Sequence, residues 1–227
     1  MLEVKSKIAH QFNTNGFVIL KNVFSEEECI QLKADCKKLL AEKPFNKTGV
    51  NVWGAEKTPQ IFLPFLKHEQ IKNVLEEIYE GPVELLSTKT VFKSKEIDFS
   101  SPWHQDRPYW GGSLKISGWI SLDNANVDNG CLKILRGSHT KLLGHDKVKE
   151  DIGFGNRLQL DPDIEKKCEP VNLSKGDVLI FSDLLLHSSY PNVNQMDRWC
   201  LIPTYRKAGA PDESLNLGGL WENPIPL

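Results

Sequence analysis

Two stretches of the sequence carry residue types that can hold a metal ion together. The segment SPWHQDRPYW (101–110) places His104 and Asp106 two residues apart. Residues two apart on a β-strand point to the same face, so this imidazole and this carboxylate can reach one cation. A third candidate ligand, His187, follows the apolar run DVLIFSDLLL. Two imidazoles and one carboxylate can occupy one face of an octahedral metal and leave the opposite positions open, which is typical of non-haem Fe(II) sites.

Arg198 extends this pattern, because it follows His187 by eleven residues at the head of an apolar segment. Its planar, forked guanidinium matches a carboxylate bidentately, so Arg198 can hold the distal acid of a dicarboxylate that chelates the metal. Each residue also has a simpler interpretation on its own. H-x-D is a short motif that arises by chance, a single histidine fits a protein core, and a single arginine fits a structural ion pair. The four residues in this order favour the metal site.

Length and composition limit the other functions. A chain of 227 residues is compatible with one domain, which we expect to span 1–227. The chain has 28 Lys and Arg against 30 Asp and Glu and no basic run, so we expect no nucleic-acid partner. No apolar run reaches the roughly 18 residues of a membrane span, and the N-terminal segment lacks an apolar signal core, which predicts a cytoplasmic protein without a membrane partner. The five cysteines are scattered without a C-x-x-C pair, which predicts reduced thiols that serve packing.

The elements that must position these residues follow from periodicity and turn residues. Ser25 and Glu28 form a capping box that predicts a helix through about residue 40, and helical spacing predicts a second helix over 70–79. Apolar and β-branched runs predict strands over 16–20, 83–93, 114–123, 130–137, 177–182 and 199–206. The predicted fold is therefore mainly β with flanking helices, a double-stranded β-helix of the jelly-roll or cupin-like type. The long irregular stretch over 139–170 is a candidate lid.

Three motifs in this order are similar to those of a known family. They are WHQD (103–106), GWISLDNANVDNGCLKILRGSH (118–139) and HSSYPNVNQMDR (187–198). Together with the early GFVIL and the capped helix after it, they make the chain resemble the phytanoyl-CoA dioxygenase family of Fe(II)- and 2-oxoglutarate-dependent oxygenases. The resemblance extends from about residue 12 to residue 206. It implies the same double-stranded β-helix.

By position, the resemblance implies that His104, Asp106 and His187 ligate Fe(II) and that Arg198 binds the C5 carboxylate of 2-oxoglutarate. It also implies four further residues of the cosubstrate pocket: Gln105, Trp119, Ser189 and Lys89. The family chemistry uses dioxygen to convert 2-oxoglutarate to succinate and CO2 while a C–H bond of a small organic substrate is oxidised. Because related halogenases replace the carboxylate ligand by a small residue, Asp106 favours a hydroxylase.

Residues around the proposed ligands predict where the substrate lies. Tyr109 and Trp110 are candidates for the substrate wall, Arg107 for a charged contact, and Trp53, in a predicted loop, for a further pocket residue. The aromatic residues can equally form the hydrophobic shell that orients the ligands and excludes water. Two other functions stay open at this point. One is a metal-dependent hydrolase or isomerase on a cupin-like fold, which leaves Arg198 without a role, and the other is a non-catalytic protein that binds a metal or a small acid.

Overall fold

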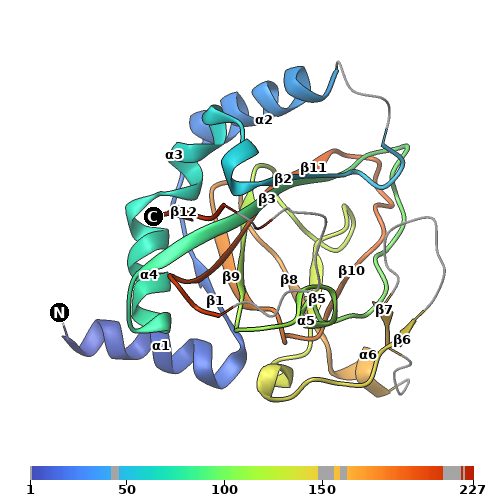
Figure 1. The fold of residues 1–227 in the computed structure, drawn as a ribbon. Coiled ribbons are helices and arrows are strands. Elements are labelled where there is room, and N and C mark those ends of the chain that lie inside the picture. Colours follow the sequence, from blue (N-terminus) through green and yellow to red (C-terminus); the bar gives the residue numbers. More distant parts are fainter. Residues whose placement is uncertain (1, 42–45, 148–155, 159–162, 212–220, 222) are drawn as a thin grey trace.

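Helices gather in the first third of the chain, and strands dominate the remainder (Figure 1). The computed structural model describes residues 2–41, 46–147, 156–158, 163–211, 221 and 223–227. The helices are α1 (Leu2–Asn15), α2 (Glu26–Ala41), α3 (Leu63–Leu66), α4 (Glu69–Tyr79), α5 (Arg107–Trp110) and α6 (Asp163–Lys167). The strands are β1 (Phe17–Leu20), β2 (Val50–Gly54), β3 (Val83–Lys93), β4 (Ile116–Ser121), β5 (Leu132–Ile134), β6 (Asp146–Lys147), β7 (Asn156–Arg157), β8 (Glu169–Val171), β9 (Val178–Ser182), β10 (His187–Ser189), β11 (Arg198–Lys207) and β12 (Ile225–Pro226).

The strands form two main antiparallel sheets. The larger sheet has the order β1-β9-β4-β11-β3-β12, and β2 also pairs with β3. The smaller sheet has the order β10-β5-β8, and β6 and β7 form a separate pair. Figure 1 shows α1 to α4 along one side of the larger sheet, with the smaller sheet on its other side. The chain is therefore mainly β with flanking helices, as the sequence predicts.

Neighbouring residues on the central strands pack into two different cores. The helix-side core lies beneath the helices and includes Val178 of β9 and Leu201 of β11. The inner core lies between the sheets and includes Leu179 and Ile202, the next residue on each of these strands. Successive residues of a strand point to opposite faces, so a strand that is covered on both faces is apolar throughout. This arrangement explains the unbroken apolar runs in the sequence.

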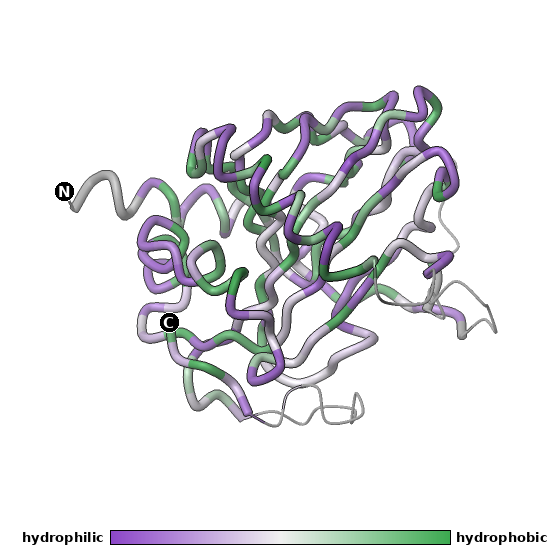
Figure 2. Tube along the Cα trace, turned by 90° about the horizontal axis from the view of Figure 1, so that it is seen from above, coloured by the Kyte–Doolittle hydropathy of each residue, from purple (hydrophilic) through white to green (hydrophobic). Residues whose placement is uncertain are grey.

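The outer helices begin and end where local chemistry predicts. At the start of α2, the Ser25 N–H donates to the Glu28 carboxylate at 2.8 Å, and the Glu28 N–H donates to the Ser25 hydroxyl at 3.2 Å. These reciprocal bonds satisfy two N–H groups that the helix leaves without partners. The end of α4 is marked by Glu80, whose φ of 51° is left-handed. Figure 2 shows hydrophobic and hydrophilic residues in turn along these helices, and buried residues of α2 and α4 belong to the helix-side core.

Several short elements, such as α3, α5 and β10, have no counterpart in the sequence prediction, and two further differences are informative. The amphipathic N-terminal segment forms α1, although it carries no capping signal that predicts a helix. The segment with Trp53 was expected to be a loop, but it forms β2 along β3. A short strand that contains Asn51 and Gly54 has weak β-propensity, and its pairing with β3 overrides that local preference. The candidate lid over 139–170 includes β6, β7 and α6, while residues 148–155 and 159–162 lie outside the described residues.

Two expectations from composition can be compared with the structure. Among the residues that the structure describes, no helix combines the length and the apolar character that a bilayer span needs. All five cysteines are free thiols, and four of them are buried. Burial raises the pKa of the Cys36 thiol to about 12. The predicted packing role of these cysteines is therefore confirmed for the four buried ones.

Candidate metal centre

A cavity of about 450 Å³ opens on the inner side of the larger sheet. Residues of β2, β3, β4 and β11 line it from the larger sheet, and residues of β5 and β10 line it from the smaller one. The three candidate metal ligands, His104, Asp106 and His187, lie in its wall together with Arg198. Strand alternation thus directs one set of side chains to the cavity and the other set to the helix-side core.

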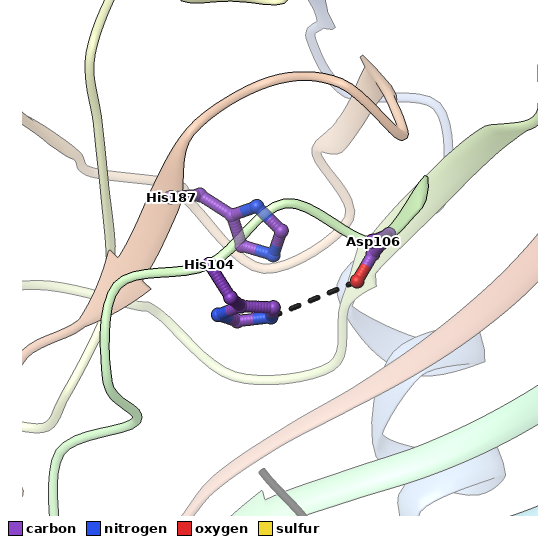
Figure 3. A group of neighbouring side chains, drawn as sticks. All are labelled: His104, Asp106 and His187. Atoms are coloured by element: carbon purple, nitrogen blue, oxygen red, sulfur yellow. Dashed lines mark ion pairs between the residues drawn. The ribbon is translucent and has the colours of Figure 1, made fainter. Parts of the chain in front are cut away.

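The three candidate ligands converge on one point of this wall (Figure 3). One ligand atom from each of His104, Asp106 and His187 lies within 4.8 Å of the others. His104 Nε2 is 3.6 Å from Asp106 Oδ1, and the two imidazole centroids are 4.2 Å apart. The backbone N–H of His104 donates to the backbone carbonyl of His187, and the backbone N–H of His187 donates to that of His104, both at 3.0 Å. This isolated β-bridge holds two ligands from distant parts of the sequence side by side.

Both histidines present Nε2 to the cavity in the form that a metal requires. His104 Nδ1 lies 2.9 Å from the Pro102 carbonyl, and His187 Nδ1 lies 2.9 Å from the Leu185 carbonyl. A carbonyl oxygen only accepts, so Nδ1 carries the proton and Nε2 keeps its lone pair. Burial, and then the neighbouring His187, lower the pKa of His104 to about 3. This imidazole is therefore neutral near pH 7, as a metal ligand must be.

A buried ion pair holds the backbone that carries Asp106. The carboxylate of the fully buried Asp183 accepts two hydrogen bonds from Arg107, at 2.6 and 2.9 Å. The Asp183 carbonyl accepts from the N–H groups of Asp106 and Arg107, at 2.8 and 3.0 Å. Burial raises the pKa of the Asp183 carboxyl, and the bonds from Arg107 oppose that rise. This pairing contradicts the substrate contact predicted for Arg107, because its guanidinium is already used and lies outside the cavity wall.

Arg198 carries a buried charge that no carboxylate balances in the part of the chain that the structure describes. The residue is only 1% exposed. Its guanidinium lies 4.8 Å from the ring centroid of Trp119, and Nη1 lies 3.4 Å from Cys200 Sγ. The buried Nε has no hydrogen-bond partner. Because an unpaired charge away from water is strongly unfavourable, this arrangement indicates a site for an anion.

A second cation lies beside Arg198. Lys93 is opposite Arg198 in the register of β3 and β11, and it is also buried. Its ammonium donates to the carbonyls of Phe99 and Tyr190, both at 2.5 Å, and to the Ser189 hydroxyl at 3.0 Å. Burial, and then Arg198, lower the pKa of Lys93 to about 7. The three donors of Lys93 are thus all used, whereas those of Arg198 are not.

Five other residues that the sequence singled out line the same cavity. They are Lys89, Tyr109, Trp110, Trp119 and Ser189. Trp119 also belongs to the inner core, so it combines the packing and the cavity roles that its strand position allowed. The indole N–H of Trp119 is buried without a partner and is available to a bound molecule.

Gln105 and Trp53 lie outside the cavity wall, contrary to the prediction. Gln105 follows His104 by one residue, and its amide makes three hydrogen bonds to backbone groups, at 2.6 to 2.9 Å. Trp53 follows Val52, which does line the cavity, and packs against Phe62 with ring centroids 5.6 Å apart. Both errors have one physical cause, because a step of one residue along an extended segment reverses the face.

Sequence reasoning missed three residues that shape this region. Lys93 lies on the same face of β3 as Lys89, so strict alternation along the predicted strand was the signal that identifies it. Asp183 had no local signal, because the partner that it holds is distant in the sequence. Trp221 lines the cavity and contacts Trp110 with ring centroids 5.4 Å apart. No motif pointed to it.

Comparison with known proteins identifies related sequences. The family model described as "Phytanoyl-CoA dioxygenase (PhyH)" matches residues 12–200. The chain is 24% identical over 214 residues to "Phytanoyl-CoA dioxygenase, peroxisomal" of Mus musculus. This alignment covers 81% of the chain and 63% of the mouse protein, so the chain spans less than two thirds of that relative's length.

Solved structures share the fold. The epimerase SnoN, in a crystal structure with Fe3+, α-ketoglutarate (2-oxoglutarate) and nogalamycin RO, matches with a TM-score of 0.77 at 18% identity over 97% of this chain and 90% of SnoN. The α-ketoglutarate-dependent carbocyclase SnoK matches with a TM-score of 0.73 at 20% identity over 97% of this chain and 92% of SnoK. These matches confirm the predicted double-stranded β-helix. Since the family model covers most of its length, the chain belongs to the phytanoyl-CoA dioxygenase family.

Proposed function

We propose that this chain is an Fe(II)- and 2-oxoglutarate-dependent dioxygenase that hydroxylates a small organic substrate. The observation that carries the proposal is the presence of the ligand triad and the unpaired Arg198 in one cavity. Two neutral imidazoles and a carboxylate are the donor set that suits non-haem Fe(II). The unpaired guanidinium suits a cosubstrate that has a second carboxylate. Family membership supports the same cofactors, which are Fe(II), 2-oxoglutarate and dioxygen.

Each group has one role in this proposal. His104, Asp106 and His187 hold Fe(II), and Arg198 binds the distal carboxylate of 2-oxoglutarate. Iron, 2-oxoglutarate and dioxygen together supply the oxidant for a C–H bond, with succinate and CO2 as coproducts. The chain contributes binding, orientation and the exclusion of water. Apolar side chains such as Phe181 line the cavity beside the triad and keep water away from it.

The finer choice of reaction rests on Asp106. A protein carboxylate at the third ligand position leaves no vacancy there for a halide, which favours hydroxylation over halogenation. The epimerase and the carbocyclase that share the fold are evidence that one fold serves several oxidative outcomes, so substrate position decides among them. A hydrolase or isomerase that uses the same triad is less favoured, because it leaves the buried charge of Arg198 without a partner.

The experiment is an anaerobic titration of the metal-free protein with Fe(II) and then with 2-oxoglutarate, which follows the visible metal-to-ligand charge-transfer band. Wild type should form the band, His187→Ala should not, and Arg198→Ala should need roughly 100-fold more 2-oxoglutarate because it loses a charged hydrogen-bonded pair. Arg136→Ala is the matched control, since Arg136 is half-exposed and pairs with Glu169 on the surface. Admission of dioxygen should then yield succinate.

Two results would contradict the proposal. One is the absence of the band in wild type at saturating Fe(II) and 2-oxoglutarate. The other is turnover of a substrate without dioxygen and 2-oxoglutarate, which would favour the hydrolase or isomerase.

A further inference from the structure

Three cavity residues alternate along β3 on the face that points away from the helices. They are Lys89, Val91 and Lys93, and all three line the cavity. Lys93 is opposite Arg198 in the register of β11, whereas Lys89 is opposite Ile202. At about 3.3 Å per residue, the backbone of Lys89 lies about 13 Å along the strand from that of Lys93. The cavity therefore has one cationic end at Arg198 and a separate cation towards its other end.

The Lys89 ammonium is free to take a ligand. In the described part of the chain it forms no hydrogen bond and no ion pair, in contrast to Lys93, whose three donors are used. Its polar contact is with Trp110, whose ring centroid lies 4.9 Å from the Nζ atom. A cation–π contact attracts the ammonium to the ring but leaves its N–H donors without hydrogen-bond acceptors. The side chain is partly buried and lines the cavity, and its Nζ lies against Trp110, which lines the same cavity.

The charge of the loaded site points to the sign of the substrate. This step rests on the proposed function. The two positive charges of Fe(II) and the one of Arg198 equal the negative charges of Asp106 and the two carboxylates of 2-oxoglutarate. Lys93, whose three donors are already used, and Lys89, whose donors are not, then add positive charge that nothing in the loaded site balances. Because charges interact strongly in a partly buried cavity, a substrate with a negative group gains affinity there.

The surroundings of Lys89 point to the rest of the substrate. The aromatic wall, which we define as Tyr109, Trp110 and Trp221, lies beside Lys89 and is continuous through the contact between the two tryptophans. Tyr109 also approaches His104, with ring centroids 6.3 Å apart. A molecule with its acid on Lys89 and its apolar body along this wall extends towards the ligand triad. Such a position brings a C–H bond of the body near the metal.

We propose that Lys89 binds the acidic group of the substrate, and that the substrate is a small organic acid, a carboxylate or a phosphonate, with an apolar body. This assignment differs from the cosubstrate contact that the sequence suggested for Lys89. Arg198 and Lys89 then divide the cavity, one end holding 2-oxoglutarate and the other the substrate acid.

The test measures binding rather than turnover. Protein loaded with Ni(II) and saturating 2-oxoglutarate, so that Arg198 is occupied, is titrated by calorimetry with phenylacetate, benzylphosphonate and the neutral phenylacetamide. Wild type should bind at least one of the two anions roughly tenfold or more tightly than the amide, and the preferred anion identifies the acid. Lys89→Gln should lose the preference, and Lys89→Arg should keep it. The control Lys95→Gln removes an exposed lysine just beyond the same strand and should change nothing.

A second measurement separates the two proposals. The affinity of each variant for 2-oxoglutarate is read from the charge-transfer band with Fe(II). A wild type that forms no band contradicts the proposed function itself. A wild type that forms the band but binds neither anion more tightly than the amide overturns the substrate assignment, as does a preference that survives in Lys89→Gln. A tenfold loss of 2-oxoglutarate affinity in Lys89→Gln would also overturn it and would return Lys89 to the cosubstrate site.

Discussion

The two ends of β11 carry two buried arginines in opposite electrostatic states. Arg206 donates from Nε to the Glu84 carboxylate at 2.6 Å, and both side chains are about nine-tenths buried. Arg198, at the other end, is more deeply buried and has no carboxylate partner in the described residues. A buried arginine with a carboxylate partner needs no other counter-charge. A buried arginine without such a partner is tolerated only where a bound ligand supplies the counter-charge. The difference separates the structural end of the strand from its functional end.

Arg206→Met should give the largest effect and act on stability alone. It leaves the Glu84 carboxylate buried without its partner, so the free energy of unfolding should fall by about 3 kcal/mol. The affinity for 2-oxoglutarate, measured at a temperature where the variant is folded, should stay within a factor of two. Denaturant unfolding checks the first expectation. A variant as stable as wild type would show that the pair contributes no more than a surface ion pair.

Arg198→Met should give the reverse pattern. The affinity for 2-oxoglutarate should fall roughly 100-fold, about 2.7 kcal/mol, because the guanidinium–carboxylate pair is lost. The stability of the ligand-free protein should stay constant or rise, since the change removes an uncompensated buried charge. Loss of stability comparable to that of Arg206→Met would mean that Arg198 already has a counter-charge, and the comparison would fail.

The sequence predicts the strand that carries both arginines, but it does not separate them. Arg198 immediately precedes the predicted strand over 199–206 and Arg206 ends it, and only the spacing of Arg198 from His187 distinguishes one from the other. Glu84 is the partner that neutralises Arg206, and it comes from β3, so the pairing depends on the sheet register. The local sequence pattern therefore predicts helices, strands and motif residues. Which charged side chains lack a partner depends on pairing between distant parts of the sequence.

The same limit explains the errors at the candidate site. Gln105 and Trp53 sit one residue from cavity residues, and a prediction that does not apply strand alternation places them on the wrong face. In the sequence, nothing near Arg107 identifies its ion-pair partner, because Asp183 contacts it only in the folded chain. The convergence of the three candidate ligands is predictable, because their residue types and their order match one kind of metal site.

Lys93 allows the comparison to be extended by changing the pH. It is a buried cation that has hydrogen-bond partners, and its pKa is lowered to about 7. In the unfolded chain its pKa is the ordinary 10.5. Between these pH values the unfolded state binds more protons than the folded state, so stability rises with pH in this window. The free energy of unfolding of wild type, relative to Lys93→Met, should increase by about 2 kcal/mol from pH 7 to pH 9. Denaturant unfolding at both pH values checks this, and a constant difference would contradict it.

Asp183→Asn should give the smallest effect and act on metal affinity. The variant loses the charge that holds Arg107, so the backbone at Asp106 is held less firmly and the affinity for Co(II) should fall about tenfold. Asp177→Asn is the matched control, because Asp177 is equally buried and pairs with Lys21 at the start of β9, away from the triad. Both variants should lose stability, but only Asp183→Asn should change the visible cobalt spectrum. Equal cobalt affinities would reduce Asp183 to a packing role.

The backbone bridge between His104 and His187 has a consequence for how the protein is made. The two imidazoles belong to segments that are far apart in the sequence and meet only when the backbone bridge to β10 forms, which is a long-range event in folding. A chain still emerging from the ribosome, or one that has partly opened, holds no complete set of ligands. Iron then binds the folded state alone, and its affinity adds directly to the cost of unfolding. The candidate metal centre therefore forms only with the complete fold, and a bound ion stabilises that fold.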